Sequence, residues 1–196
     1  MHYLFCPLHP APQANNGGYA ILPPGWSHPR RKLASSVIIL GQKGIVLLDE
    51  EGELLEVKPN NLVLLTAGRF HQGFKPIESQ ASYYWFHFTL PNKPVLFSNE
   101  EITPILSNKH ITLQRLAKAS LIPQQLDLGE SNRISFLFRE LLNEQERPCY
   151  TNWRFQLLFQ NLLVEITNET ISSYQPPDMQ TAISSLVYKV ISEIST

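Results

Sequence analysis

The sequence predicts an α+β protein, with strands in its N-terminal half and helices in its C-terminal half. From Tyr3 to about Leu90, short apolar runs alternate with turn signals at the spacing typical of an all-β sandwich or barrel. After Pro94, apolar residues recur every three or four positions instead of every two. The chain has 196 residues, of which 43% are hydrophobic, which is enough to bury an ordinary core.

The clearest local prediction in the first half is a β-hairpin. Gly44–Leu48 and Glu53–Val57 flank the acidic connection Asp49–Gly52, which suits a four-residue loop. Before it, residues 7–29 are rich in Pro, Gly and Asn, and only Tyr19–Leu22 suggests a strand. We therefore expect an irregular arm that lies over the strands and can act as a lid.

Two amphipathic helices are predicted in the second half. The first begins just after Ser131, a residue type that often caps a helix N-terminus. The second runs from Thr151 to about Ile171, and Pro148 lies in the connection between them. A short connection makes an antiparallel pair, which can pack on the strands and on a partner subunit. The apolar stripe of the first helix comprises Ile134, Leu137, Phe138, Leu141 and Leu142.

The apolar face of the second helix is wider than packing against one β-domain requires. We therefore predict that this helix forms the interface of a homodimer, with Leu157 and Val164 extending the stripe. The predicted dimerisation residues are Phe155, Leu158, Phe159, Leu162 and Ile166.

Residues 175–196 are predicted to follow the first domain. The segment Gln175–Asp178 contains two adjacent prolines, which favour an extended interdomain linker. Another helical stripe starts at Met179 and reaches Thr196 without a later partner, which predicts that a further domain is cut there. The first domain is expected to cover residues 1–174, with the β-structure over about 1–95 and helices over about 98–174.

Composition excludes several classes of protein. The formal net charge is -1 and no basic stripe is present, which argues against DNA binding by this part of the chain. Cys6 and Cys149 lie far apart, so neither a disulfide framework nor a zinc site is expected. No signal peptide is visible, and no apolar run reaches the roughly 18 residues that span a bilayer. We expect a cytoplasmic protein that makes no membrane contact.

An aromatic strand is the best candidate for binding a ligand. Alternate side chains of a strand face opposite ways, and the periodicity alone leaves open which face is inside. Aromatic rings on the inner face can lie against the apolar face of a sugar, or can simply fill the core. The two faces of this strand carry Tyr83, Trp85 and His87 on one side and Tyr84, Phe86 and Phe88 on the other.

The stretch Val57–His71, followed fourteen residues on by the aromatic Trp85–Phe88, resembles one family. It is similar to the N-terminal domain of AraC-type transcription regulators. That domain has a strand, a Pro-Gly-Asp-like turn, an apolar strand, a Pro-Gly-x-x-His-like loop and an aromatic strand ending in His-Phe. This chain departs at Asn60-Asn61, where the family usually has Gly-Asp, and at Ala67, where Pro is common.

The resemblance implies a fold and a function. The fold is a cupin-like (jelly-roll) β-barrel followed by an antiparallel helical pair. The function is to sense a small-molecule effector, with carbohydrate as the expected class, and to dimerise. DNA would be bound only through a C-terminal helix-turn-helix domain, whose first helix would begin near Tyr188–Glu193.

The resemblance also implies a set of ligand-binding residues. It favours the Tyr83 and Trp85 face as the pocket lining, and places an Arg before the first strong strand. Only one of Arg30 and Arg31 can point inward, and a guanidinium suits hydroxyls or a carboxylate. The arm would contribute lid contacts. The full expected set is Arg30, Arg31, Trp85, Tyr83, His71, Tyr19, Trp26 and His87.

Catalysis is not predicted. A cupin metal site needs a His-x-His pair, a Glu a few residues later and a third His, but this chain has no His-x-His. His71 and His87 supply two ligands at most, and neither Glu53 nor Glu56 has the required place. No Gly-x-Ser-x-Gly motif is present. We therefore expect no enzyme activity, no metal and no cofactor.

Two alternatives stay open. One is a stand-alone cupin enzyme, such as a sugar isomerase or epimerase, which stoichiometric metal in the purified protein would favour. The other is a structural dimerisation module whose barrel is filled by its own side chains. In that module Trp85 would contribute to stability and no ligand response would exist.

Overall fold

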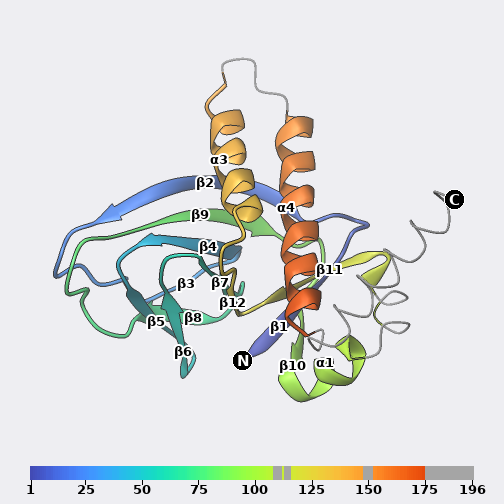
Figure 1. Cartoon of the computed structure of the whole chain (residues 1–196), viewed down its shortest axis with the longest axis horizontal. Helices are drawn as coiled ribbons and strands as arrows, with labels where there is room; N and C mark the ends of the chain where they lie inside the picture. Colours follow the sequence, from blue (N-terminus) through green and yellow to red (C-terminus); the bar gives the residue numbers. More distant parts are fainter. Residues whose placement is uncertain (108–111, 113–115, 148–151, 175–196) are drawn as a thin grey trace, which may run out of the picture.

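The computed structural model describes residues 1–107, 112, 116–147 and 152–174, which form an α+β structure as the sequence predicts (Figure 1). Within these residues the strands make three sheets with antiparallel pairing. The five-stranded sheet runs in the order β12 (Gln125–Asp127), β7 (Asn61–Leu65), β4 (Ser36–Lys43), β9 (Ala81–Thr89) and β2 (Gln13–Leu22). The four-stranded sheet consists of β3 (Arg31–Lys32), β8 (Phe70–Gly73), β5 (Val46–Glu50) and β6 (Glu53–Val57). The three-stranded sheet consists of β10 (Val95–Ser98), β1 (His2–Pro7) and β11 (Ala119–Pro123), and the helices are α1 (Asn99–Leu106), α3 (Arg133–Gln145) and α4 (Asn152–Ser173).

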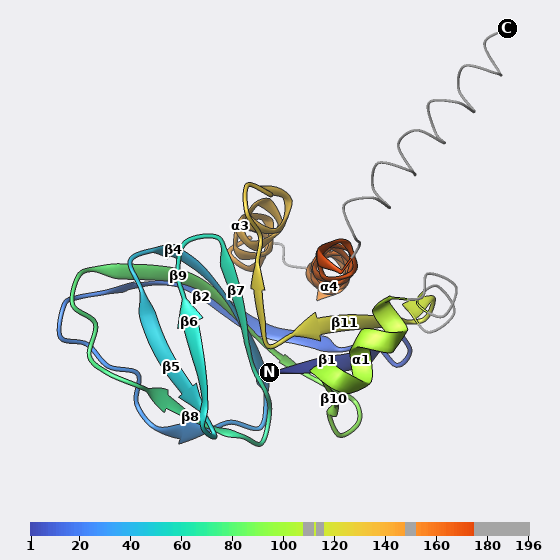
Figure 2. The same cartoon turned by 60° about the horizontal axis from the view of Figure 1, so that its bottom comes forward.

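The central strands of the five-stranded sheet, β4 and β7, are buried on both faces. One face packs against the four-stranded sheet, and the other packs against α3 and α4, which stand side by side over it (Figure 1 and Figure 2). In β4, Val37 and Ile39 belong to the hydrophobic cluster between the two sheets, whereas Ile38 and Leu40 belong to the cluster shared with α3 and α4. Burial on both faces explains why β4 and β7 read as continuous apolar runs instead of alternating ones.

Strands β5 and β6 form the predicted hairpin with a tighter turn than expected. The pairing continues to Glu50 and Glu53, so the loop has two residues instead of four. Both loop residues, Glu51 and Gly52, have positive φ, at 52° and 91°, which is typical of a type I′ turn. The Gly52 N–H donates a hydrogen bond to the Asp49 carboxylate at 2.8 Å, which further fixes the turn.

Strand β2 replaces much of the expected irregular arm. A strand was expected only at Tyr19–Leu22, but the pairing with β9 begins at Gln13 and continues to Leu22. That expectation is wrong because Gly17 and Gly18 do not make a turn. They lie in the strand, where they allow close packing against aromatic rings.

The two glycines face different parts of the molecule. A Cβ atom at Gly17 would lie 2.1 Å from the ring of Phe86, on the face that packs against the helices. A Cβ atom at Gly18 would lie 2.8 Å from the ring of Trp85, on the opposite face. Glycine is therefore required at both positions for the rings to lie against the strand.

Gly17→Ala is expected to lower the free energy of unfolding by about 1–3 kcal/mol, because the added methyl group overlaps a fully buried ring. Gly18→Ala is the matched control and is expected to cost less, because Trp85 is only partly buried and can shift. Urea denaturation of both variants measures the difference. Equal losses would contradict the assignment of the two rings to environments of different rigidity.

The segment after Pro94 contains strands that the helical periodicity did not predict. Strands β10 and β11 pair with the two edges of β1, and β12 pairs with β7. Strand β11 is buried at every position, so it shows no alternation that could have revealed it. Helix α1 then starts at a capping box, in which Ser98 and Glu101 bond to each other's backbone N–H groups.

Helices α3 and α4 match the two predicted amphipathic segments. Ser131, the expected N-cap, instead donates its hydroxyl hydrogen to Glu169 at 2.7 Å, and Asn132 occupies the cap position. Pro148 and Thr151 lie outside the described residues, as do Cys149 and the whole of 175–196, including the predicted linker and last helical stripe. Among the described helices, none combines the length and the apolar character that crossing a bilayer demands.

The predicted dimerisation residues lie inside the domain. Four of them are buried and the fifth, Leu158, is partly buried against the same cluster. The apolar stripe of α4 is therefore used to cover the five-stranded sheet and α3, and it is not available to a partner. The four buried residues are Phe155, Phe159, Leu162 and Ile166.

Candidate ligand-binding site between the two sheets

A cavity of about 190 Å³ lies between the five-stranded and four-stranded sheets. Strands from both sheets and the loop before β3 contribute its lining. Apolar residues of β4 and β7 form part of the wall, and His28 joins it from the loop. Six of the eight residues predicted to bind a ligand line this cavity, namely Trp26, Arg31, His71, Tyr83, Trp85 and His87.

The strand register decides which face of β9 is inside. Residues that pair across an antiparallel ladder project on the same side of the sheet. Trp85 pairs with Ile39 and His87 pairs with Val37, and both partners belong to the cluster between the two sheets. The rings of Trp85 and His87 meet edge to face, with centroids 5.2 Å apart. The Ser35 hydroxyl holds His87 through a 2.8 Å hydrogen bond to Nδ1.

Strand β3 separates the two candidate arginines. Arg31 pairs with His71 across the β3–β8 ladder and lines the cavity. Arg30 lies outside, with its guanidinium 4.1 Å from the centroid of the Phe70 ring, and Lys32 approaches the same ring. Arg30 is therefore corrected from a pocket residue to a surface residue, because alternate residues of an extended segment face opposite sides.

Tyr19 is the second residue that does not reach the cavity. It pairs with Tyr84 across the β2–β9 ladder, so it faces away from Trp85. Its hydroxyl donates to Ser82 at 2.9 Å, and its ring lies 4.8 Å from that of Tyr84. With 47% of its surface exposed, Tyr19 belongs to the outer surface and is not a lid contact.

The loop that carries Trp26 and His28 is held by backbone hydrogen bonds. Gly73 of β8 donates its N–H to the His28 carbonyl at 2.8 Å. Trp26 accepts from the Ile77 N–H at 2.8 Å, and Gly25 donates to the Ile77 carbonyl at the same distance. The loop therefore fixes Trp26 and His28 as part of the wall. His28 is not among the residues predicted to bind a ligand, because its position in a Pro-rich segment is the one signal that the sequence offers for it.

His71 is the most unusual polar side chain in the cavity. Only 2% of its surface is exposed, and neither ring nitrogen has a hydrogen-bond partner among the described residues. Burial, with smaller contributions from His28, Arg31 and His87, lowers its pKa from 6.5 to about 4. The nearby backbone of Arg69 raises the pKa of His71 in part. It lies outside hydrogen-bond geometry with either ring nitrogen. At neutral pH the ring is uncharged and can both donate and accept a hydrogen bond.

Burial also favours the uncharged form of the other titratable histidines and of the tyrosine in the cavity. Burial and Arg31 together lower the pKa of His87. Burial also lowers the pKa of His28, and the Pro29 carbonyl opposes this by accepting a hydrogen bond from its ring. Burial raises the pKa of Tyr83. In the described part of the chain, no group of three or more His, Cys, Asp or Glu side chains is arranged to hold a metal ion.

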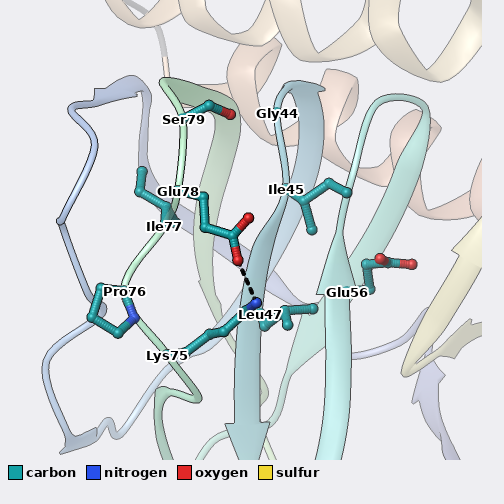
Figure 3. Close-up of a pocket in the computed structure, with 9 residues that line it drawn as sticks. All are labelled: Gly44, Ile45, Leu47, Glu56, Lys75, Pro76, Ile77, Glu78 and Ser79. Atoms are coloured by element: carbon teal, nitrogen blue, oxygen red, sulfur yellow. Dashed lines mark hydrogen bonds and ion pairs between the residues drawn. The ribbon is translucent and has the colours of Figure 1, made fainter.

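A larger cavity, of about 350 Å³, lies on another part of the surface (Figure 3). It is bounded by Ile45 and Leu47 of the β5 region and by the loop that contains Lys75 and Glu78. These two charges pair with each other at 2.7 Å, and none of the predicted ligand-binding residues lies there. We consider the smaller cavity the better site, because it gathers unpaired polar groups and aromatic rings.

Comparison with known proteins gives limited similarity. No protein-family model matches the chain, and no curated protein matches it. Among solved structures, the cupin domain of Schizosaccharomyces pombe Cnp3 is 14% identical, with a TM-score of 0.35 over 37% of this chain and 54% of that one. A predicted oxalate decarboxylase from Thermotoga maritima is 18% identical, with a TM-score of 0.35 over 40% and 68%. A Cupin 2 conserved barrel domain protein from Salinispora arenicola is 19% identical, with a TM-score of 0.34 over 41% and 76%.

Each of these three structures matches less than half of the chain. The chain spans about half the length of the Cnp3 cupin domain that it matches. The compared proteins include one described as an enzyme and one described as a domain of a larger protein. Scores this low identify neither the family nor the activity of this chain.

Proposed function

We propose that this chain is the effector-sensing and dimerisation domain of a bacterial AraC-type transcription regulator. It binds a sugar or a similar small molecule inside a cupin-like barrel and transmits occupancy to attached DNA-binding domains. The proposal is supported above all by one observation. Side chains from five strands and a loop converge on a single cavity, and they include two indoles, an arginine and an unpaired buried histidine.

The two faces of β9 supply a route for transmission. Trp85 and His87 line the cavity, whereas the intervening Phe86 packs on Phe138 of α3 and Phe155 of α4. A ligand that moves Trp85 therefore acts on the strand that supports both helices. Because packed cores switch between discrete arrangements, a small shift of β9 can reposition α3 and α4.

The ligand-binding part of this proposal is tested by thermal unfolding. The melting temperature of the protein is measured against mono- and disaccharides at millimolar concentration, with the wild type, Trp85→Ala and Tyr84→Ala. A ligand at a hundredfold excess over its dissociation constant stabilises the folded state by about 2.7 kcal/mol. The shift is expected in the wild type and in Tyr84→Ala, whose residue faces α3, and is expected to be lost in Trp85→Ala.

Two results would contradict the proposal. A shift that survives in Trp85→Ala would place the ligand elsewhere. Stoichiometric Fe, Mn, Ni or Zn in the purified protein would favour a cupin enzyme, since the sensor needs no metal.

A dimer would have to use residues that the fold leaves exposed. On α4, Trp153 and Leu157 are 81% and 65% exposed, and Val164 continues the same face of the helix. Leu157→Glu is expected to convert the dimer to a monomer in sedimentation velocity at micromolar concentration. The control is Phe74→Glu. Phe74 is also exposed, but it follows β8 and is not part of α4. A wild-type monomer would contradict the dimer.

A further inference from the structure

We infer that the cavity between the two sheets recognises a small carboxylate anion, with the carboxylate held between Arg31 and His71. This inference rests on the proposed ligand-binding function and narrows its ligand class from sugars in general to acidic ones. Its first support is the charge of the lining. The titratable side chains there are one arginine, three histidines and a tyrosine, and no Asp or Glu accompanies them among the described residues.

Arg31 and His71 are placed to act together. They are direct partners across the β3–β8 ladder, so their side chains project from adjacent positions on the same face. Arg31 is exposed and His71 is buried, so the pair extends from the cavity mouth into the interior. A guanidinium offers a planar fork that fits both oxygens of a carboxylate, and a histidine N–H adds a further donor.

The buried ring of His71 has no hydrogen-bond partner among the described residues, whereas Arg31 is exposed to solvent. Arg31 forms no ion pair with any described residue, and both ring nitrogens of His71 are buried without a hydrogen-bond partner. Buried polar groups of folded proteins are normally paired, and an unpaired one costs free energy. A carboxylate that accepts from the His71 ring would supply its missing partner, and it would also pair with the exposed Arg31.

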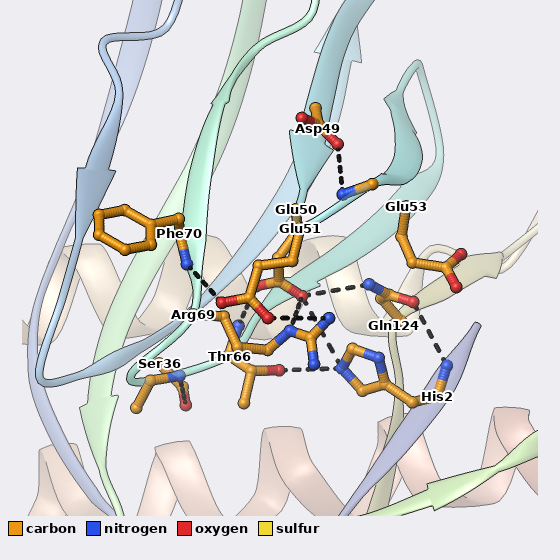
Figure 4. A network of polar contacts seen from close by, with 12 residues as sticks. His2, Ser36, Asp49, Glu50, Glu51, Glu53, Thr66, Arg69, Phe70 and Gln124 are labelled. Atoms are coloured by element: carbon orange, nitrogen blue, oxygen red, sulfur yellow. Dashed lines mark hydrogen bonds and ion pairs between the residues drawn. The ribbon is translucent and has the colours of Figure 1, made fainter.

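The nearest acid in the sheet is already engaged elsewhere. Glu50 pairs with His71 across the β5–β8 ladder, but its carboxylate accepts from the Thr66 N–H at 2.6 Å and from Gln124 at 3.1 Å (Figure 4). Arg69 lies 3.4 Å from the same carboxylate. This acid therefore does not neutralise Arg31 or bond the ring of His71.

The rest of the cavity sets the size and shape of the ligand. Its volume of about 190 Å³ is below the roughly 300 Å³ at which pockets for drug-sized ligands begin, so the ligand is no larger than a monosaccharide. Trp26 and Trp85 offer flat apolar surfaces, and the Tyr83 hydroxyl offers a further polar contact. A carboxylate attached to one flat ring, either a sugar acid or an aromatic acid, fits this lining.

Binding of an anion should depend on pH. Burial, together with the neighbouring His28, Arg31 and His87, disfavours protonation of His71, whose pKa is about 4. A bound carboxylate reverses this effect, because an opposite charge favours the protonated ring. Affinity for a carboxylate should therefore rise as pH falls from 8 to 6, whereas affinity for a neutral analogue should stay flat.

The experiment compares charged and neutral ligands of matched shape on the whole chain. The probes are glucuronate against glucose, and benzoate against benzamide, each measured by thermal shift and by calorimetry at pH 6, 7 and 8. The variants are Arg31→Gln and His71→Gln, with Arg30→Gln as the control, since Arg30 is the adjacent arginine on the outer surface. We expect a carboxylate to stabilise the wild type and Arg30→Gln, and Arg31→Gln to weaken its binding by about tenfold or more.

The outcomes separate this inference from the proposed function. Stabilisation by a neutral sugar that equals or exceeds that by its acid would overturn the inference and leave the sugar sensor in place. Loss of binding in Arg30→Gln but not in Arg31→Gln would overturn the assignment of the site. No stabilisation by any of these probes or by the wider sugar panel would overturn both proposals.

Discussion

Phe86→Ala is expected to lower the free energy of unfolding by about 3–5 kcal/mol, because it removes a fully buried ring from the centre of the helix-facing core. The ring centroid lies 5.6 Å from that of Phe138 and 6.2 Å from that of Phe155, so one deletion removes contacts to both helices. Gly17 on β2 gives no side chain that could fill the space. For a domain of this size, each kcal/mol lowers the melting temperature by roughly 2–4 °C.

The measurement is chemical and thermal denaturation of Phe86→Ala beside Phe74→Ala. Phe74 is the same residue type with 60% of its surface exposed, so its loss should change stability by less than about 0.5 kcal/mol. A small loss in Phe86→Ala would mean that the helices do not depend on β9. In that case the proposed route from the cavity to α3 and α4 would also fail.

Glu50→Ala is expected to cost a similar amount, about 3–5 kcal/mol, because it removes the centre of a buried polar network (Figure 4). The carboxylate accepts hydrogen bonds from the Thr66 N–H and Gln124, and it pairs with Arg69 at 3.4 Å. His2 of β1 lies 3.8 Å away, so the network joins the three-stranded sheet to the four-stranded one. Alanine would leave these donors buried without an acceptor.

The matched control for this variant is Glu51→Ala. Glu51 is the next residue, pairs with the same Arg69 at 3.5 Å and has a side chain that is 40% exposed, so its loss should cost about 1 kcal/mol or less. Urea denaturation at pH 7 compares the two. Similar losses would show that Arg69, and not burial of the acid, accounts for the effect.

The same network makes the stability of the folded protein depend on pH. Burial raises the pKa of Glu50 from 4.5 to about 7, against the opposing effects of Thr66, Arg69 and Gln124. The folded state therefore binds a proton more tightly than the unfolded state. The stability that this contributes is present below about pH 4.5 and is lost as pH rises through about 7.

Comparison with Glu50→Gln isolates this contribution. Relative to that variant, the wild type should lose about 3 kcal/mol of stability between pH 4.5 and pH 7, since each unit of pKa shift corresponds to about 1.4 kcal/mol. His2 acts in the opposite sense, because burial lowers its pKa to about 4 and its contribution is lost as pH falls. A stability difference that stays flat between pH 4.5 and pH 7 would refute the raised pKa of Glu50.

Local patterns in the sequence predicted several elements correctly. The β5–β6 hairpin followed from an acidic, Gly-containing connection between two apolar runs, and α3 and α4 followed from stripes of apolar residues at helical spacing. The alternation of side chains along β9 correctly assigned Trp85 and Phe86 to opposite faces of the strand. These predictions succeed because turn geometry and the periods of strands and helices are properties of short segments.

Other features depended on contacts between distant segments. The glycines of β2 look like a turn until the rings of β9 are placed against them, and the uniformly buried β11 shows no period. Helix α4 has one wide apolar stripe, and only its contact with the sheet shows that Phe155 and Phe159 are covered while Leu157 is exposed. Amphipathicity reveals that a face will be buried, but it does not identify the surface that buries it.

The residues of the candidate site were also predicted in part from the sequence and decided in part by the tertiary structure. The sequence by itself determined which residue types could bind a small molecule, and it proposed eight of them. Only the tertiary structure decided that Arg31 faces the cavity while Arg30 stacks on Phe70, and that Tyr19 lies outside. The physical reason is that a cavity is formed by the register between strands. A one-residue shift of that register would exchange the inner and outer faces, and no single segment encodes it alone.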